Sequence, residues 1–116
     1  MTRAELIEAL ETAQGVDRGL FIAAFDCCHP APCGAVGGPV PDAYYAWLRV
    51  KDRFCHLLNT DAYLDAAMML ATGDNAKFIA LSDAMVALEK AGWPNGTWHE
   101  HLPRFIAAAC LRAGGE

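Results

Sequence analysis

The sequence predicts a small single domain, residues 1–116, that is mainly α-helical, with about five helices, a short antiparallel β-hairpin (an α+β fold) and a long loop at residues 29–42. The chain has 116 residues, of which 54% are hydrophobic and 20% charged, which favours one folded core over a disordered segment. Alanine, leucine and methionine dominate the apolar residues and favour helices over strands. Prolines and glycines gather in one stretch, which interrupts the helical pattern.

Caps and apolar spacing predict the first two helices. Thr2 and Glu5 have the spacing of a capping box, and apolar residues then recur at helical intervals up to Gly15. Asp17 is placed to cap a second helix, whose apolar stripe ends at Cys28. Because only a few residues separate the two helices, we expect them to pack as an antiparallel pair.

The secondary structure of the middle of the chain is predicted from its prolines and glycines, which interrupt helices, and from its aromatic residues. Four prolines and three glycines make residues 29–42 a long loop. Residues 44–50 are aromatic-rich and strand-like, residues 51–53 suit a turn, and residues 54–58 can return as a second strand. We favour this hairpin, packed on the helices. The alternative is one helix with its inward face formed by Tyr44, Leu48, Cys55 and Leu58.

Three further helices are expected in the second half. Thr60 or Asp61 can cap one that Gly73 ends. Another begins at Asn75 and is closed by a glycine and a proline, and Pro103 suits the first turn of the last helix. The apolar spacing of the helix that begins at Asn75 rests on Phe78, Leu81, Met85 and Leu88.

The net charge and the N-terminal residues indicate which partners and which cellular compartment suit the protein. The formal charge of −5 argues against direct nucleic-acid binding but leaves a basic protein partner open. The first eight residues include acidic side chains where a signal peptide needs an apolar run, and no apolar stretch reaches the ~20 residues of a membrane span. We therefore expect a soluble, cytoplasmic protein without membrane contact. Its five cysteines, an odd number, fit reduced thiols.

Cysteine and histidine side chains offer one chemical hypothesis, a structural zinc site with four ligands. The candidate ligands are Cys28, Cys33, Cys55 and His56. We prefer a plainer interpretation, in which Cys27 or Cys28, and Cys110, are small buried residues on helix faces and the protein has no cofactor. A nucleophilic Cys28 or Cys55 beside a histidine is the enzyme alternative. No catalytic motif surrounds any cysteine, so we predict no catalytic residues and no enzymatic activity.

Two sets of residues are candidates for binding a partner. The aromatic set is Tyr44, Tyr45 and Trp47. Alternation along a hairpin forces one side of this set outward, and Tyr and Trp are enriched at the centres of interfaces. The acidic set is Glu5, Glu8 and Glu11. These carboxylates share roughly one face of the first helix and could meet a basic groove, although a solvated face is the plainer interpretation.

Three stretches of the chain carry a resemblance to a known group of proteins. Residues 2–18 read as a helix, a glycine and an acidic–basic pair, residues 64–70 contain a Leu-Asp-Ala-Ala segment, and residues 102–113 read as an alanine-rich helix that ends in Leu-Arg-Ala. These stretches resemble small uncharacterised proteins of bacteriophages and prophages related to the phage ABA-sandwich domain. The resemblance implies an α/β/α sandwich and a phage or prophage origin, hence the cytoplasm of a bacterial host. Residues 78–91, by contrast, read as helix where that group has strand-like sequence.

Together these features predict a phage or prophage accessory protein that works by binding a host or phage protein. An inhibitor of a host defence system, of the anti-CRISPR kind, is one specific form. The alternatives are a small zinc-stabilised interaction module and a homo-oligomeric minor structural component of the phage. The basis is small size, negative charge, aromatic residues that can lie exposed, and a sequence without a catalytic motif.

Overall fold

The computed structural model describes residues 2–31, 42–71, 73–93 and 95–113. In chain order, the elements are α1 (Arg3–Thr12), α2 (Arg18–Cys28), α3 (Asp42–Asn59), α4 (Tyr63–Met68), α5 (Asp74–Ala91), the 3₁₀ turn η1 (Asn95–Thr97) and α6 (Trp98–Ala113). The described residues contain no strand. The expectation of a mainly helical chain is therefore confirmed, but the α+β class is not.

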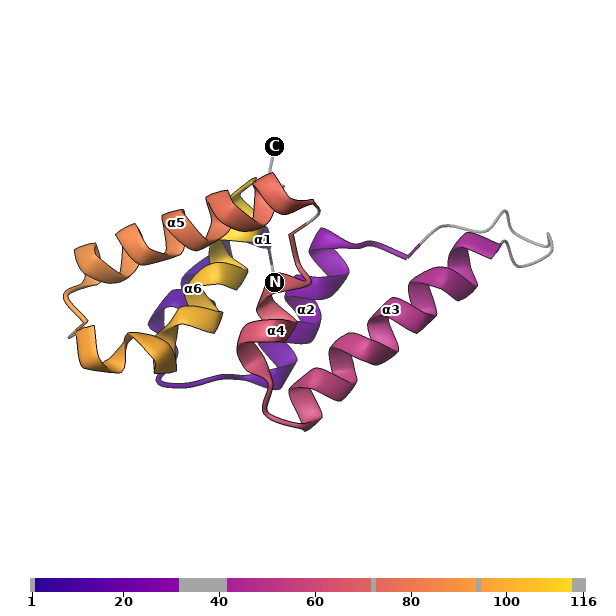
Figure 1. Ribbon diagram of the computed structural model, residues 1–116, viewed down its shortest axis with the longest axis horizontal. Coiled ribbons are helices and arrows are strands. Elements are labelled where there is room, and N and C mark those ends of the chain that lie inside the picture. Colours follow the sequence, from indigo (N-terminus) through magenta and orange to yellow (C-terminus); the bar gives the residue numbers. More distant parts are fainter. Residues whose placement is uncertain (1, 32–41, 72, 94, 114–116) are drawn as a thin grey trace.

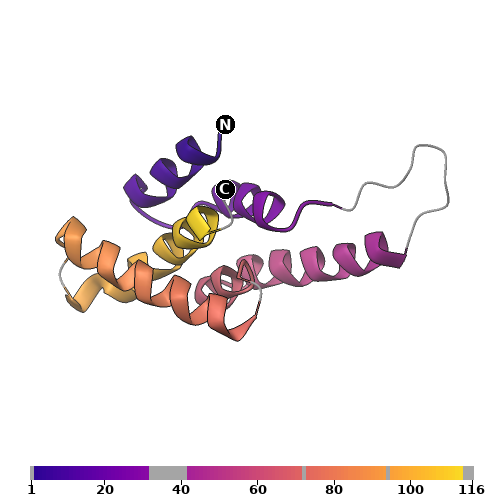
Figure 2. The ribbon, with the colours of Figure 1, turned by 90° about the horizontal axis from the view of Figure 1, so that it is seen from above.

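Helix α6 lies at the centre of the fold and packs against α1, α2, α4 and α5 (Figure 1; Figure 2). Every residue from Pro103 to Leu111 is buried. Three consecutive alanines, residues 107–109, present small side chains, so neighbouring helices can approach this stretch closely. A helical stretch that is apolar all round has to be enclosed, and α6 therefore organises the helices around it.

Two arginines join α1 to α6 through backbone carbonyl groups. Arg3 donates from Nη1 to the carbonyl oxygen of Leu111 at 2.7 Å, and Arg104 donates from Nη1 to that of Leu10 at 2.6 Å. Both carbonyls lie in the last turn of a helix, where they lack a partner within that helix and where the helix dipole favours positive charge. Each helix therefore supplies a cation to the C-terminal end of the other.

Arg104 is fully buried and also contacts a histidine of its own helix. Its Nη2 lies against Nδ1 of His101, and the Trp93 ring stacks on the His101 ring with centroids 3.9 Å apart. Burial, and then the charge of Arg104, lower the pKa of His101. A neutral His101 can accept the hydrogen bond from Arg104, whereas a protonated one would repel it.

Most of the predicted helix boundaries are confirmed by cap geometry. The Thr2 hydroxyl accepts from the Glu5 amide at 3.1 Å and the Glu5 carboxylate accepts from the Thr2 amide at 2.9 Å, which completes the capping box. Asp17 accepts from an amide in the first turn of α2. Gly73 and Gly92 flank α5 with φ of 86° and 81°, a conformation that favours glycine.

Three predicted boundaries are wrong. Helix α4 ends at Met68, so Gly73 does not end it as predicted but directly precedes α5. Helix α4 begins after Ala62, which makes no side-chain cap, so neither Thr60 nor Asp61 caps it. Thr60 instead donates its hydroxyl to carbonyls at the end of α3. Helix α6 begins at Trp98, one turn earlier than predicted, so Pro103 lies inside the helix rather than in its first turn.

The hairpin predicted over residues 44–58 is wrong, because α3 runs through this whole segment as one helix. Phe54 and Leu58 are buried and Trp47 is half-buried, a spacing that follows the period of a helix and not that of a strand. The three charged residues at 51–53 include no glycine, proline or asparagine, so nothing there ends the helix. The sheet layer implied by the resemblance to the ABA-sandwich group is likewise missing from the described residues.

The long loop predicted at residues 29–42 lies mainly outside the described residues. Residues 29–31 follow α2 without helical structure, and Asp42 already belongs to α3. Residues 32–41, between these ends, are not among those described. The prediction of a loop at 32–41 therefore stays a prediction.

Replacing the buried Arg104 by alanine should destabilise the fold strongly. The Arg104→Ala variant leaves the Leu10 carbonyl and His101 without their donor, and we expect its free energy of unfolding to fall by about 3 kcal/mol in urea denaturation. Arg18→Ala is the matched control, because Arg18 is exposed and its pair with Asp61, at 3.5 Å, should contribute less than about 1 kcal/mol. Equal losses in both variants would contradict this account.

His101 should make the fold sensitive to mild acid. Its folded pKa lies below the ordinary value of 6.5, so as the pH falls below 6.5 the unfolded chain binds a proton that the folded chain does not. Stability is therefore fully present above that pH and declines below it. Urea denaturation at pH 7.5 and 5.5 should show a larger loss for the wild-type protein than for His101→Gln. An equal loss in the two proteins would assign the effect to other groups.

Candidate interaction surface

The outer face of α5 carries large apolar side chains that the fold leaves uncovered. Their exposed fractions lie between 44% and 71%. They are Phe78, Ile79, Met85 and Val86, and together we call them the α5 apolar face. On the inner side of the helix, Ala80, Ala84 and Leu88 are buried. A helix that is apolar on both sides is ordinarily covered on both, so the α5 apolar face is the strongest candidate for an interaction site.

The polar surroundings of this face resemble the rim of an interface. Charged residues of both signs lie on the same helix, and all of them except Glu89 lie outside the two lines of apolar side chains. They are Asp74, Lys77, Asp83, Glu89 and Lys90. An apolar centre with a polar border is the usual anatomy of a protein–protein contact.

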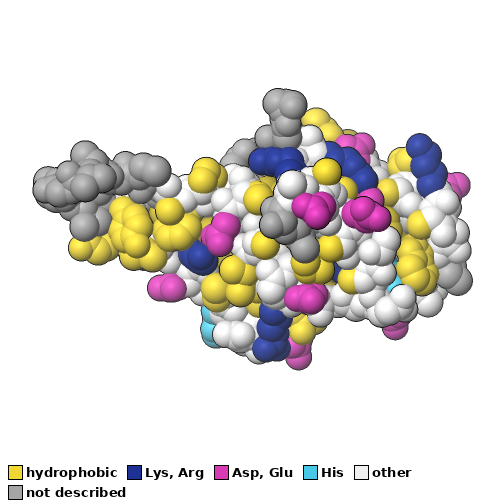
Figure 3. Space-filling view, turned by 180° about the vertical axis from the view of Figure 1, so that it is seen from behind, with side chains coloured by type: hydrophobic (Ala, Val, Ile, Leu, Met, Phe, Trp, Pro, Cys, Tyr) yellow, Lys and Arg dark blue, Asp and Glu magenta, His cyan; other side chains and the backbone are white. Residues whose placement is uncertain are grey.

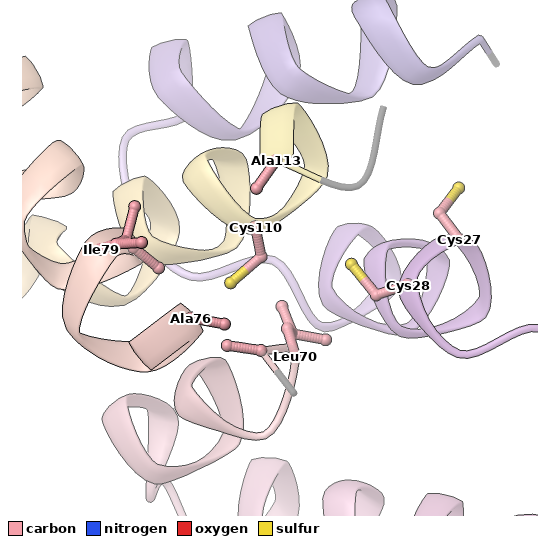
Figure 4. A pocket seen from close by; sticks show the side chains of 9 residues that line it. Cys27, Cys28, Leu70, Ala76, Ile79, Cys110 and Ala113 are labelled. Carbon is pink, nitrogen blue, oxygen red and sulfur yellow. The ribbon is translucent and has the colours of Figure 1, made fainter. Parts of the chain in front are cut away.

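A hollow of about 290 Å³ adjoins the N-terminal half of α5. Figure 4 shows that Cys28 of α2 and Cys110 of α6 direct their sulfur atoms towards it, whereas the sulfur of Cys27 points away. Ile79 of the α5 apolar face also lines it. The other lining residues are small or aliphatic, namely Leu70, Ala71, Ala76, Ala80 and Ala113. The hollow therefore has an apolar wall that contains one buried thiol, Cys110, and one half-buried thiol, Cys28.

Burial keeps these two thiols protonated. It raises the pKa of Cys28 to about 11 and that of Cys110 to about 12. The thiolate is the form that attacks electrophiles and binds metals, and both groups carry little of it near neutral pH. The four cysteines in the described part of the chain carry free thiols. The raised pKa of Cys28 is unfavourable to the enzyme alternative based on this residue, which stays a prediction.

The predicted zinc ligands lie on different elements. Cys28 is on α2, the neighbours Cys55 and His56 are on α3, and Cys33 lies outside the described residues. On a helix, adjacent side chains point about 100° apart, so Cys55 and His56 diverge. Across the ranges that the structure describes, no three His, Cys, Asp or Glu side chains form a group suited to a metal ion. The zinc alternative stays a prediction.

The aromatic set lies at the start of α3, where hydrophobic side chains gather over the N-terminal half of the helix (Figure 3). Trp47 is half-buried, and its indole N–H donates to the carbonyl oxygen of His29 at 2.6 Å. Tyr44 is half-buried against the Trp47 ring, with centroids 5.9 Å apart. Tyr45 is exposed. Trp47 thus attaches α3 to the end of α2, and Tyr45 is the member most open to a partner.

Two of the three carboxylates of the acidic set make hydrogen bonds within the chain. Glu5 belongs to the capping box, and its hydrogen bonds with Thr2 lower the pKa of its carboxyl group. Glu11 accepts from Nη2 of Arg112 at 2.7 Å, which adds a link between α1 and α6. Glu8 is exposed. Two of the three carboxylates therefore support the fold, and binding of a basic partner by the set stays a prediction.

Our sequence analysis did not identify the α5 apolar face as a site. It treated Phe78, Leu81, Met85 and Leu88 as one apolar stripe, but Phe78 and Met85 point outward and Leu88 is buried. The available signal was a second apolar line, Ile79 and Val86, which made the helix too apolar for a single buried face. The spacing alone could not show which line faces the core.

No protein-family model matches the chain, and no curated protein or solved structure is significantly similar to it. Within the described ranges, every helix is too short or too polar to cross a membrane.

Alkylation rates should distinguish the thiols of Cys28 and Cys110 from the exposed thiol of Cys27. Raising a thiol pKa from 9.0 to about 11 lowers its thiolate fraction near neutral pH about 100-fold, so Cys28 and Cys110 should react with iodoacetamide far more slowly than the exposed Cys27. Tandem mass spectrometry after timed labelling at pH 7.5 measures each rate. In urea the rates should converge. Fast labelling of Cys28 in the folded protein would restore the enzyme alternative.

Proposed function

We propose that the protein acts by binding another protein through the α5 apolar face and catalyses no reaction. One observation carries the proposal: four large apolar side chains lie exposed, in two neighbouring lines, on a helix whose opposite side is part of the core. Single exposed apolar residues are common on folded proteins, but four on one helix face mark an interaction site.

The energetics of the strip suit a binding surface. Fully burying one Phe, Met, Ile or Val side chain is worth about 1.5–3 kcal/mol, so covering four half-exposed side chains can supply several kcal/mol towards association. The inner side of α5 already packs on α6, so the helix is held in place before a partner arrives. A rigid, preformed helix face loses little conformational entropy on binding, which favours affinity.

The specific form that we propose is a phage or prophage accessory protein, with inhibition of a host defence system as its activity. The support for this form is the resemblance of residues 2–18, 64–70 and 102–113 to phage and prophage proteins.

A pull-down from bacterial lysate tests the proposal. We expect the wild-type protein to capture a defined partner and the Phe78→Ser/Met85→Ser variant to lose it, because the apolar centre of the contact is removed. Leu64→Ser is the matched control, since Leu64 is a comparably exposed apolar residue on α4 and should leave capture unchanged. Circular dichroism confirms that all three proteins are folded. Capture that survives the double substitution would refute the role of α5.

A further inference from the structure

We infer that the occupant of the α5 apolar face is a second copy of this chain, with the two α5 helices packed antiparallel across a two-fold axis at Ser82. This inference rests on the proposed function, since it names the partner of the same surface. The argument comes from the spacing of the exposed residues, their symmetry about Ser82 and the position of a single carboxylate.

Seven of the exposed residues of α5 fall into three lines that repeat every seven residues, and the remaining exposed residues, among them Asp74, Asp83 and Lys90, lie outside these lines. Phe78 and Met85 form one outer line, and Ile79 and Val86 form the other. Between them runs a polar line of exposed residues, namely Asn75, Ser82 and Glu89. A seven-residue repeat is the pattern of a helix that packs lengthwise against another helix at a shallow angle. The natural occupant of this strip is therefore a helix.

The strip is complementary to itself when the second helix is antiparallel. Each outer line is centred near Ser82, so a two-fold axis there places Phe78 of one copy beside Met85 of the other and Ile79 beside Val86. Methionine sulfur packs favourably against aromatic rings, and the small Ser82 side chain lets the two helices approach closely. All four members of the α5 apolar face are buried in this arrangement.

The polar line selects the antiparallel orientation. In that orientation Asn75 of one copy faces Glu89 of the other, so the amide can donate to the carboxylate. The Glu89 carboxylate also meets the N-terminal turn of the opposite α5, where the helix dipole is positive. In a parallel pair, Glu89 would face Glu89, which is repulsive. Charge therefore favours the antiparallel pair.

The size of the strip predicts a weak dimer. Helix α5 has 18 residues and is about 27 Å long, so one helix face buries less than the roughly 800 Å² per partner of a standard interface. We expect a dissociation constant of about 10–100 μM, which is typical of small, transient contacts. Each copy keeps its own core around α6, so the monomer stays folded when the dimer separates.

Sedimentation equilibrium from about 1 μM to about 1 mM tests the inference on the full chain. We expect the wild-type protein to pass from monomer to dimer over this range. Ser82→Arg places two positive charges at the axis and should raise the dissociation constant at least about tenfold. Ser82 is exposed, so the variant should fold, and its thermal melt verifies this.

A charge exchange tests the antiparallel register. Asn75→Glu brings two carboxylates together between the copies and should weaken the dimer several-fold, while Asn75→Glu/Glu89→Lys should restore it through an ion pair. Residues 75 and 89 are about 21 Å apart along one helix, so restoration requires contact between copies. Gln14→Glu is the matched control, because it adds the same charge at an exposed position outside α5. Failure of the double substitution to restore the dimer would overturn this register.

The outcomes separate this inference from the proposed function. A wild-type protein that stays monomeric at about 1 mM refutes the dimer, as does a dimer that Ser82→Arg leaves intact. If a monomeric protein still captures a partner that the Phe78→Ser/Met85→Ser variant loses, the proposed function stands without the inference. If capture also fails to depend on α5, both are refuted.

Discussion

The fold depends on enclosing α6, and the main constraint on that enclosure is the buried cation of Arg104. Removing a guanidinium from water costs several kcal/mol unless its donors find acceptors, and in the described residues no carboxylate approaches Arg104. Its acceptors are instead the Leu10 carbonyl at the end of α1 and the neutral ring of His101. These contacts fix α1 against α6 and require His101 to stay unprotonated beneath Trp93.

The central position of α6 also explains why one side of α5 keeps an apolar surface. Because α1, α2 and α4 occupy other sides of α6, α5 packs on it through its inner side alone, where Ala80 and Ala84 allow close contact. The chain has no further described element that covers the outer side. The exposed strip is therefore a consequence of where α6 lies, and it can change without removing core contacts. This separation is what allows substitutions on the outer side of α5 to report on binding and not on folding.

Local signals predicted the helices well, whereas tertiary contacts decided the rest. Thr2, Glu5 and Asp17 act within one turn of their own helices, so sequence alone could place those starts. The aromatic residues at the beginning of α3 favour a strand by local propensity, and the contact of Trp47 with the end of α2 overrides that preference. On α5, two apolar lines compete for the core, and only the position of α6 decides between them. The site was missed for this reason.

The polar groups that could have carried chemistry are largely committed to holding the fold together. His101 accepts from a buried arginine, the ring of His29 contacts the carbonyl oxygen of Met69, and the thiols of Cys28 and Cys110 are protonated against apolar walls. Charging His101 or Cys110 would place a charge among buried side chains, which would weaken the packing around α6. The α5 apolar face bears no such structural role, so binding through this surface is compatible with the fold.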